Sequence, residues 1–404
     1  MSDNQQPKPY DAVLGGQNQP SEGAAVLGGI QGVKKKLKNS NPQLRIIAVE
    51  QALNYKEAGI DLIIKALEDE SPLVQAKAYS LLTPRNELKV KKALQEFQPL
   101  GLKLELIEVV TVNRSGEIIQ RQQSLAKYFT ENLAKIIQRQ LYRKQRLAKY
   151  SLEDLGNYKT LEMAYIPGGT FIMGSPQTEK LSNNKERPQH QVTIKPFFMG
   201  KYPVTQAQWR AVAQLPKINL DLNPDSRYFE GKNRPVFNVT WHEAVEFCSR
   251  LSKATGKKYG LPSEAEWEYA CRAGTTTPFH YGETITGELA NFRADNTYLN
   301  ESKGEWREQT IPVGQFPPNA FALYDMHGNV WEWCQDPWNR NYNKAPTDGS
   351  PRVNYNYTES RERVLRGGSW TLNPEYLRSA KRFKLLDYGS YGHYVGFRVA
   401  CNVF

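Results

Sequence analysis

The sequence contains no uninterrupted apolar run of about 18 residues, the length that a membrane-spanning helix requires, so we expect no membrane span. Its first residues form neither a basic nor an apolar stretch, and we expect no secretory signal. Histidine is scarce, and no HExxH pair occurs, which argues against a histidine-based metal catalyst. Cysteine is equally scarce, without CxxC spacing. The surroundings of the cysteines predict free buried thiols in a reducing, cytoplasmic location: Cys248, Cys271, Cys334 and Cys401.

Charge is distributed unevenly along the chain. The net charge is +11, and residues 32–150 hold 22 Lys and Arg against 12 Asp and Glu, which accounts for nearly all of the excess. A basic helical surface can bind nucleic acid or an acidic partner, or it can simply be a solvated face, and the sequence leaves these alternatives open. At 404 residues the chain is long enough for two domains.

The first part of the chain separates into an arm and a helical region. Residues 1–30 are rich in Gln, Pro, Gly and Asn and contain the pentapeptide AVLGG twice, so we expect a flexible arm. Over residues 31–101 apolar residues recur at spacings of three and four, which predicts helices. Asn41 and Ser71 each precede a proline, as an N-cap does. The paired helices resemble a HEAT-like repeat, with a plain small helical domain as the alternative.

Residues 102–150 are predicted to join the two parts of the chain. Residues 102–118 alternate in polarity and contain turn signals from Asn113 to Gly116, which predicts a strand pair. Residues 119–150 are strongly basic, and we expect them to form a long helical spacer.

Residues 151–404 have a different character. Gly, Pro and Trp are frequent and apolar runs are short, which predicts short strands, few helices and much irregular structure around an aromatic core. The run YGLPSEAEWEYACRAG predicts a helix that is capped by Ser263 and turns Trp267, Ala270 and Cys271 inward. Together with the N-terminal helices, this predicts an α+β protein.

Six motifs follow one another through residues 155–404. They are LEMAYIPGGTFIMGS, PFFMGKYPVTQAQW, PVFNVTWHEAVEFCSRL, YGLPSEAEWEYACRAG, VGQFPPNAFALYDMHGNVWEWCQD, and RVLRGGSW with the later RSAKR and GFRVA. This succession resembles the formylglycine-generating enzyme family, also called the sulfatase-modifying factors. The resemblance covers essentially the whole region, and it implies that family's fold, whose C-terminal part is similar to a C-type lectin.

The residues that carry catalysis in that family are replaced. Members that make formylglycine use two cysteines five positions apart, shortly after the RGGS motif, as thiolates on copper. The matching positions here are Leu372 and Leu377, and a leucine can neither ionise nor bind a metal. We therefore expect no formylglycine-generating activity and no copper. A second enzymatic branch uses iron held by histidines of a helical domain, and no histidine precedes His190 here.

The resemblance also implies structural calcium, held by oxygen ligands around the LYDMHGNVWEW motif. The ligands that carry over are Asp325, Gly328, Val330 and Glu332 for one site and Asn291 and Phe292 for another. Calcium prefers several oxygen ligands, including carboxylates. The alternative is that the two carboxylates only satisfy backbone amides or an arginine.

The last stretch, RGGSWTLNPEYLRSAKRFKLLDYGSYGHYVGFRVAC over residues 366–401, resembles the variable proteins of diversity-generating retroelements within that family. Its fixed positions match, among them Asn373-Pro374, Arg378-Ser379-Ala380, Arg382 and Asp387. The resemblance implies that the remaining positions form a diversified binding surface, on what reads as an irregular loop. The expected ligand-binding residues are Thr371, Leu372, Glu375, Tyr376, Leu377, Lys381, Phe383, Lys384, Leu385, Tyr388, Ser390, Tyr391, His393 and Tyr394.

The composition of this stretch favours binding rather than catalysis. Tyr, Ser, Gly and His on a loop supply contact area and adaptable hydrogen bonds at low cost in side-chain entropy. We therefore expect a non-catalytic protein with a protein ligand. Burial of Tyr388, Tyr391 and Tyr394 in the core is the alternative. Two other functions stay open, namely an oxidoreductase that uses different residues and an adaptor that works through its basic helices.

Overall fold

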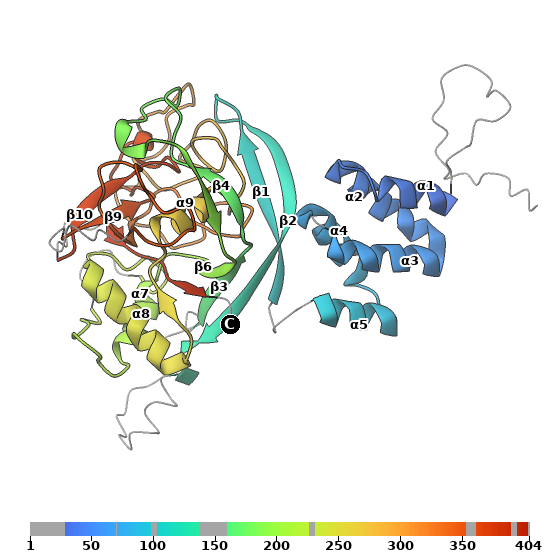
Figure 1. Cartoon of the computed structure of the whole chain (residues 1–404), viewed down its shortest axis with the longest axis horizontal. Helices are drawn as coiled ribbons and strands as arrows, with labels where there is room; N and C mark the ends of the chain where they lie inside the picture. Colours follow the sequence, from blue (N-terminus) through green and yellow to red (C-terminus); the bar gives the residue numbers. More distant parts are fainter. Residues whose placement is uncertain are drawn as a thin grey trace, which may run out of the picture. The chain divides into compact units, whose positions relative to one another are not determined.

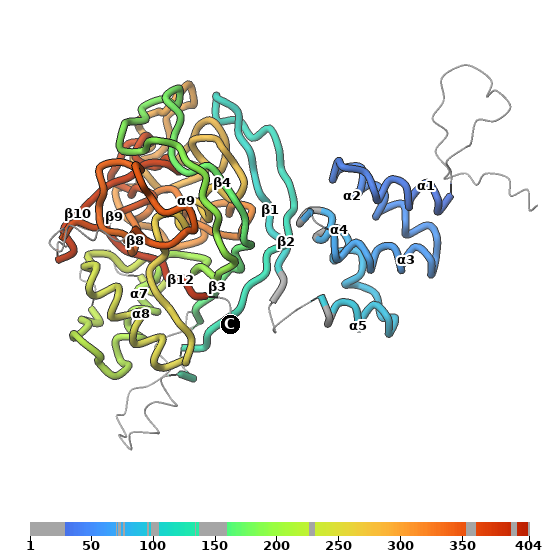
Figure 2. The backbone as a smooth tube through the Cα atoms, viewed as in Figure 1, coloured from blue at the N-terminus to red at the C-terminus, as the bar shows by residue number. Residues whose placement is uncertain are grey.

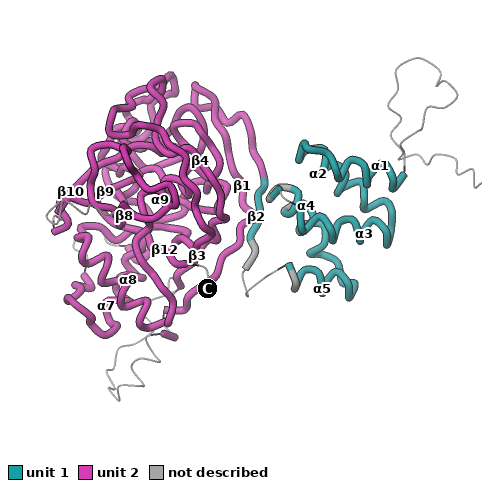
Figure 3. Tube along the Cα trace, viewed as in Figure 1, with its two compact units in different colours: residues 1–106, 123–125 teal, residues 107–122, 126–404 magenta. Residues whose placement is uncertain are grey.

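The computed structural model describes residues 29–69, 71–97, 103–133, 135–136, 160–225, 231–352, 361–388 and 394–402. The chain divides into two compact units, unit 1 with residues 1–106 and 123–125, and unit 2 with residues 107–122 and 126–404 (Figure 3). The predicted flexible arm lies outside the described residues except at its end, where the first helix begins.

Unit 1 is made of short helices, coloured blue in Figure 1. They are α1 (Gly29–Lys36), α2 (Pro42–Ala52), α3 (Lys56–Lys65), α4 (Pro72–Leu82) and α5 (Leu88–Phe97), with the 3-10 turns η1 (Leu53–Tyr55) and η2 (Ala66–Glu68). The side-chain oxygen of Asn41 accepts a hydrogen bond from the Gln43 amide at 2.9 Å and so caps α2. Both helix starts predicted from Asn-Pro and Ser-Pro are confirmed. The HEAT-like arrangement stays a prediction.

The five helices of unit 1 share one apolar cluster. Its buried members are Val33, Ala48, Val49, Ala52, Ile60, Ile63, Ala66, Leu67, Val74, Ala78, Leu82 and Val90. Beside them, the buried Arg45 guanidinium donates to both carboxylate oxygens of Asp69 at 3.0 Å. This ion pair joins the start of α2 to the loop before α4, so unit 1 has a core of its own.

The region predicted to contain a strand pair and then a long helix, residues 102–150, contains two long strands instead. Strand β1 (Lys103–Val112) leads through a turn at Gly116, which has φ +80°, into β2 (Ile118–Asn132). The turn is confirmed, but the predicted long helix is wrong over residues 119–132. The remainder of that helix, residues 137–150, lies outside the described residues.

Tertiary pairing explains the strand conformation of β2. Its second half pairs antiparallel with β3 (Thr160–Ile166), and Phe129 stands opposite Met163. The buried Phe129 ring meets Phe198 edge-on, with centroids 4.8 Å apart. Burial on a sheet decides strand formation more than local preference does, and the sequence pattern of β2 does not reveal its partner. The second half of β2 therefore forms part of the sheet of unit 2.

Three sheets form the framework of unit 2. Their strand orders are β1-β2-β3-β6-β12-β7, β10-β9-β8-β11 and β4-β5. The remaining strands are β4 (Gly169–Met173), β5 (His190–Ile194), β6 (Phe197–Gly200), β7 (Tyr259–Gly260), β8 (Trp331–Pro337), β9 (Glu362–Arg366), β10 (Phe383–Leu386), β11 (Val395–Gly396) and β12 (Ala400–Asn402). Figure 2 shows β8, β9 and β10 beside one another within long connecting loops.

Among the described residues of unit 2, three helices accompany these sheets, and each begins with a reciprocal cap. They are α7 (Gln206–Ala213), α8 (Trp241–Thr255) and α9 (Glu264–Arg272), with the 3-10 turns η5 (Asn184–Glu186) and η6 (Pro374–Tyr376). At α9, Ser263 accepts from the Glu266 amide while the Glu266 carboxylate accepts from the Ser263 amide. Trp267, Ala270 and Cys271 are completely buried, so the predicted capped helix and its inner stripe are confirmed.

The described elements confirm the α+β class, with helices in unit 1 and a sheet-rich unit 2. All four cysteines are buried and free, as predicted. Among the helices that the structure describes, none is both long and apolar enough to cross a membrane.

Candidate functional site

The stretch of residues 366–401 contains buried anchor positions. They coincide with the fixed frame of the sequence motif, and none is more than 7% exposed: Arg366, Ser369, Arg378, Ser379, Ala380, Arg382, Asp387, Phe397, Val399, Arg398, Ala400 and Cys401. Four of these anchors are arginines. Buried charges persist in proteins only where they are paired and hydrogen-bonded, so their partners define how the stretch is held.

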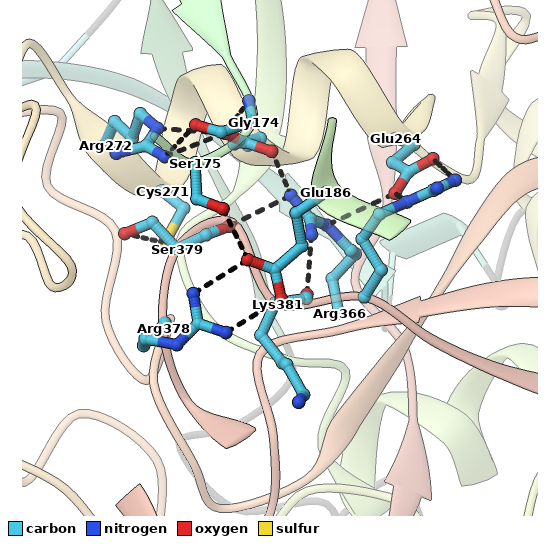
Figure 4. A network of polar contacts seen from close by, with 12 residues as sticks. Gly174, Ser175, Glu186, Glu264, Cys271, Arg272, Arg366, Arg378, Ser379 and Lys381 are labelled. Atoms are coloured by element: carbon cyan, nitrogen blue, oxygen red, sulfur yellow. Dashed lines mark hydrogen bonds and ion pairs between the residues drawn. The ribbon is translucent and has the colours of Figure 1, made fainter. Parts of the chain in front are cut away.

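Arg378 is held by a segment almost two hundred residues earlier in the chain. Its guanidinium donates to both carboxylate oxygens of Glu186 at 2.8 Å (Figure 4). It also contacts Glu179. Glu186 accepts a further hydrogen bond from the Ser175 hydroxyl at 2.7 Å. Such a bidentate, fully buried pair fixes both direction and position of the arginine. The loop that carries Glu179 and Glu186 therefore supports the C-terminal stretch.

Arg366 and Arg382 are anchored on helix α9. Arg366 contacts the Glu268 carboxylate and donates to the carbonyl oxygens of Ser379 and Lys381. Arg382 forms a two-pronged pair with Glu264, at 2.6 and 2.7 Å. Helix α9 thus supports the RSAKR segment in two ways, through Arg366 at its backbone carbonyls and through Glu264 at the Arg382 side chain.

The charge of Glu264 is stabilised by this network. Burial alone would raise the pKa of its carboxyl group, but the positive charges of Arg382 and Arg366 outweigh burial and hold the pKa below its usual value. Glu264 consequently stays ionised, which keeps the ion pairs on α9 formed at neutral pH.

Between the anchors lie the positions that the sequence assigns to ligand binding. Those that are exposed or half-buried are Thr371, Leu372, Glu375, Tyr376, Lys381, Phe383, Lys384, Leu385, Tyr388 and Tyr394. Phe383 is 41% exposed and Tyr388 is 55% exposed, unusual values for aromatic side chains. Ser390, Tyr391 and His393 lie outside the described residues.

Leu377 is an exception, and its assignment to the binding surface is wrong. Its side chain is completely buried in an apolar cluster with Phe279, Phe292 and Tyr298. A Cβ added at Gly368 would lie only 2.8 Å from the Leu377 side chain, and the Leu377 carbonyl accepts a hydrogen bond from the His327 ring at 2.7 Å. A side chain without solvent contact cannot take part in an exposed surface.

Part of the stretch is more regular than the sequence suggests. Phe383 to Leu386 form strand β10, which pairs antiparallel with β9, so this part is not an irregular loop. The ring of Phe383 stacks on the buried Trp331 at 5.4 Å and 19°. Strand pairing and stacking hold the exposed side chains on a firm base.

The positions of the family's cysteine pair are apolar in space as well as in sequence. Leu372 packs against the same cluster that contains Leu377. A thiol does lie nearby, since Cys271 is 3.6 Å from the Ser379 hydroxyl. Burial raises the pKa of Cys271 to about 12, so at neutral pH this thiol is protonated and unreactive. Neither leucine nor a buried neutral thiol supplies copper ligands.

The predicted calcium ligands around the LYDMHGNVWEW motif do not fit the ion. The Glu332 carboxylate accepts from the Arg398 guanidinium at 2.7 and 2.8 Å and from the Trp267 indole at 2.6 Å, which uses both oxygens. Asp325 accepts from the Gly314 amide at 2.8 Å. These contacts correspond to the alternative stated above, in which the carboxylates satisfy an arginine and an amide.

The second predicted calcium site is equally incomplete. The Asn291 carbonyl accepts from the Asn329 amide at 2.8 Å, while its side-chain oxygen is buried without a hydrogen-bond partner. One orphan oxygen is far from the several ligands that calcium requires. Within the described ranges, no three His, Cys, Asp or Glu side chains gather as metal ligands do.

Sequence reasoning missed the residues that support the stretch from elsewhere. Glu179 and Glu186 belong to no motif that points to Arg378, and only the fold brings them together. Trp241, at the start of α8, lies under Arg363, which precedes the motif frame. The run ERVLR, whose last residue begins the RGGS motif, does not alternate in polarity, so no signal in the sequence extended the site to Arg363.

Comparison with known proteins identifies relatives of unit 2. The profile of one family, described as the sulfatase-modifying factor enzyme 1-like domain, matches residues 152–403. The mouse protein named formylglycine-generating enzyme is 28% identical over 269 residues, which are 53% of this chain and 68% of the mouse protein. A Chlamydia caviae protein named serine/threonine-protein kinase pkn1 is 29% identical over 68% of this chain, but only 44% of the chlamydial protein's length is matched.

Two solved structures are similar as well. PvdO from Pseudomonas aeruginosa is 36% identical and superposes with a TM-score of 0.51, over 60% of this chain and 95% of PvdO. Variable protein 1 of Treponema denticola is 24% identical with a TM-score of 0.47, over 60% of this chain and 96% of that protein.

Proposed function

The chain belongs to the family of the sulfatase-modifying factor enzyme 1-like domain, and we propose that it is a non-catalytic member that binds a protein ligand through residues 366–401. In this proposal the stretch is the diversified recognition surface of a diversity-generating retroelement variable protein. Unit 2 serves as the scaffold that presents it.

One observation carries the proposal, namely the separation of anchors from displayed side chains. Arg366, Arg378 and Arg382 are buried and paired with carboxylates, whereas Phe383 and Tyr388, which follow them in the chain, are exposed. A surface whose sequence changes must keep its backbone while its side chains are replaced. Buried ion pairs that lie outside the displayed positions meet this requirement, because substitution of an exposed residue leaves them intact.

The displayed residues suit recognition of a protein. Exposed aromatic rings provide large contact areas with few rotatable bonds and are frequent at the energetic centres of interfaces. Tyr376 adds a ring beneath the Lys381 ammonium, at 4.5 Å. An oxidoreductase of the same fold would need other reactive groups, and the thiol beside the stretch, Cys271, is buried and protonated.

The same reasoning extends to location and to unit 1. Four free buried thiols support a reducing, cytoplasmic environment. We propose that unit 1 acts as a HEAT-like docking module, and that its lysines, including the Lys34–Lys35–Lys36 run at the end of α1, meet an acidic partner.

A peptide-display library selected on the full chain tests the proposal. We expect the selected ligands to lose affinity by at least about tenfold when Phe383 and Tyr388 are both replaced by Ala, since anchor residues of this kind contribute about 2 kcal/mol or more. The matched control is Ile172→Ala with Ile218→Ala, because these side chains are 50% and 37% exposed and lie elsewhere on unit 2. Ligands that lose affinity equally in both variants, or in neither, would contradict the proposal.

A further inference from the structure

Two arginines beside the displayed residues have no carboxylate partner among the residues that the structure describes. Arg361 lies over the ring of the exposed Tyr388, with its guanidinium carbon 5.6 Å from the ring centroid. Arg363 lies 4.0 Å over the ring of Trp241. Neither arginine forms an ion pair with a described residue, and the Nε of Arg363 is buried without a hydrogen-bond partner there.

The carboxylates around these arginines are already engaged. The Asp387 carboxylate lies 3.4 Å from the Nε2 atom of His242, and Glu362 accepts from the Lys384 ammonium at 2.6 Å. Burial lowers the pKa of Arg363, and the negative charges of Asp387 and Asp336 do not offset it. The local charge balance therefore favours an additional anion next to Arg363.

The two guanidinium groups share one face of the sheet. Arg361 directly precedes β9, and Arg363 is the second residue of that strand. The hydrogen bond between Arg361 and Asp387 continues the pairing of β9 with β10, so the side chains of Arg361 and Arg363, two residues apart, point to the same side. Leu385 of β10 pairs with Arg363 in the register, and the Asp387 amide donates to the Arg361 carbonyl at 2.6 Å. The Trp241 amide in turn donates to the Asp387 carbonyl at 3.0 Å. Both arginines thus stand on a fixed backbone that joins β9, β10 and the start of α8.

Stacking on an aromatic ring leaves the edge of a guanidinium group free. That edge carries parallel N–H donors that match the two oxygens of a carboxylate, which is the geometry that makes arginine–carboxylate pairs strong and directional. A ring underneath also limits the rotation of the arginine before a ligand arrives, so less entropy is lost on binding. Two such groups on one face fit a segment that carries more than one acidic side chain.

We propose that Arg361 and Arg363, which lie outside the variable stretch, form a constant acidic-segment site at the border of the recognition surface. The site would select protein ligands that present closely spaced Asp or Glu residues beside an apolar or aromatic residue, which contacts Phe383 and Tyr388. The proposal rests on the proposed binding function and names the ligand class of the same surface.

Short fluorescein-labelled peptides of alternating Glu and Tyr, with matched Gln–Tyr and Lys–Tyr peptides, test this site in anisotropy titrations of the full chain. We expect the Glu–Tyr peptide to bind at least about tenfold more tightly than the Gln–Tyr peptide, and Arg361→Gln with Arg363→Gln to abolish that difference. The matched control is Arg114→Gln with Arg121→Gln, which removes equal charge from the β1–β2 hairpin and should leave the difference in place.

A variant with reversed charges distinguishes loss of the site from loss of the fold. Arg361→Glu with Arg363→Glu should switch the preference to the Lys–Tyr peptide, which an unfolded variant cannot do. Equal binding of the Glu–Tyr and Gln–Tyr peptides, or loss of the difference in the hairpin control, would overturn the proposal. So would tighter binding of a single-stranded oligonucleotide of equal charge, which would make nucleic acid the ligand class. If library ligands still depend on Phe383 and Tyr388 in any of these cases, the proposed function stands without this site.

Discussion

At the scale of the residue, buried ion pairs fix the position of the C-terminal stretch. Arg378 and Glu186 are both completely buried, so neither can be hydrated if its partner is lost. A pair of this kind contributes little compared with an apolar pair of the same shape, yet loss of one member is costly because it leaves an uncompensated charge. The arginines of the frame are therefore indispensable for a reason unrelated to ligand contact.

Replacement of Arg378 by Ala should lower the free energy of unfolding of unit 2 by about 3–5 kcal/mol. Replacement of Lys384, whose pair with Glu362 is exposed, should change it by less than about 1 kcal/mol. Urea unfolding followed by tryptophan fluorescence measures both. Similar losses in the two variants would show that the frame arginines are not special.

The carboxyl group of Asp336 should make the stability of unit 2 depend on pH. Burial raises its pKa to about 7, and the charge of Glu264 adds to this, while the amides of Arg352 and Glu264 that donate to it oppose the rise. Between pH 4 and this value the folded chain retains a proton that the unfolded chain has lost. Stability attributable to Asp336 is thus present at low pH and is lost as the pH rises through about 7.

The Asp336→Asn variant should remove this dependence. We expect the free energy of unfolding of the natural chain to fall relative to that of the variant between pH 5 and pH 8, as measured by urea unfolding at both values. Parallel behaviour of the two proteins over this range would mean that the Asp336 pKa is not raised.

At the scale of the element, sequence signals correctly predicted the features that depend on neighbouring residues, such as helix starts. The caps at Asn41 and Ser263 lie beside the residues they bond, and both helix starts were predictable. Strand β2 depends instead on β3, some thirty residues later, and its basic, glutamine-rich first half shows no strand period. The same holds for β10, whose strand form follows from pairing with β9.

Phe129 tests whether β2 belongs to the core of unit 2. Phe129→Ala should cost unit 2 about 3–5 kcal/mol, because the ring is buried against Phe198. Ile119→Ala in the same strand should be nearly neutral, since Ile119 is 63% exposed. A neutral Phe129→Ala variant, measured by denaturant unfolding, would return this segment to the role of a spacer.

At the scale of the whole molecule, the family resemblance predicted more of the fold and of the site than local residue patterns did. The six motifs predicted the fold and showed that leucines replace the family's catalytic cysteines. The fixed positions of residues 366–401 predicted most of the exposed positions between them. They did not distinguish Leu377 from its neighbours, because burial of one leucine depends on Phe279 and Tyr298, which come from distant parts of the chain. Nor did they indicate that Arg398 satisfies Glu332, a carboxylate carried over as a calcium ligand.

The contact between Arg398 and Glu332 leads to a prediction about the effect of metal ions on stability. A ligand that binds only the folded state raises its stability by an amount that grows with the logarithm of the ligand concentration over the dissociation constant. With Glu332 engaged by Arg398, we expect neither EDTA nor millimolar calcium to move the melting temperature. A calcium-dependent rise in melting temperature would show that the ion displaces the arginine.

The most direct test of the account is a stability measurement on every single substitution across residues 366–401, by protease resistance of the displayed full chain. The account predicts tolerance at the exposed positions Phe383, Lys384 and Tyr388 and loss of folding at Arg366, Arg378 and Arg382. Folding that is lost as often at the exposed positions as at the arginines would contradict the claim that a fixed scaffold displays a changeable surface.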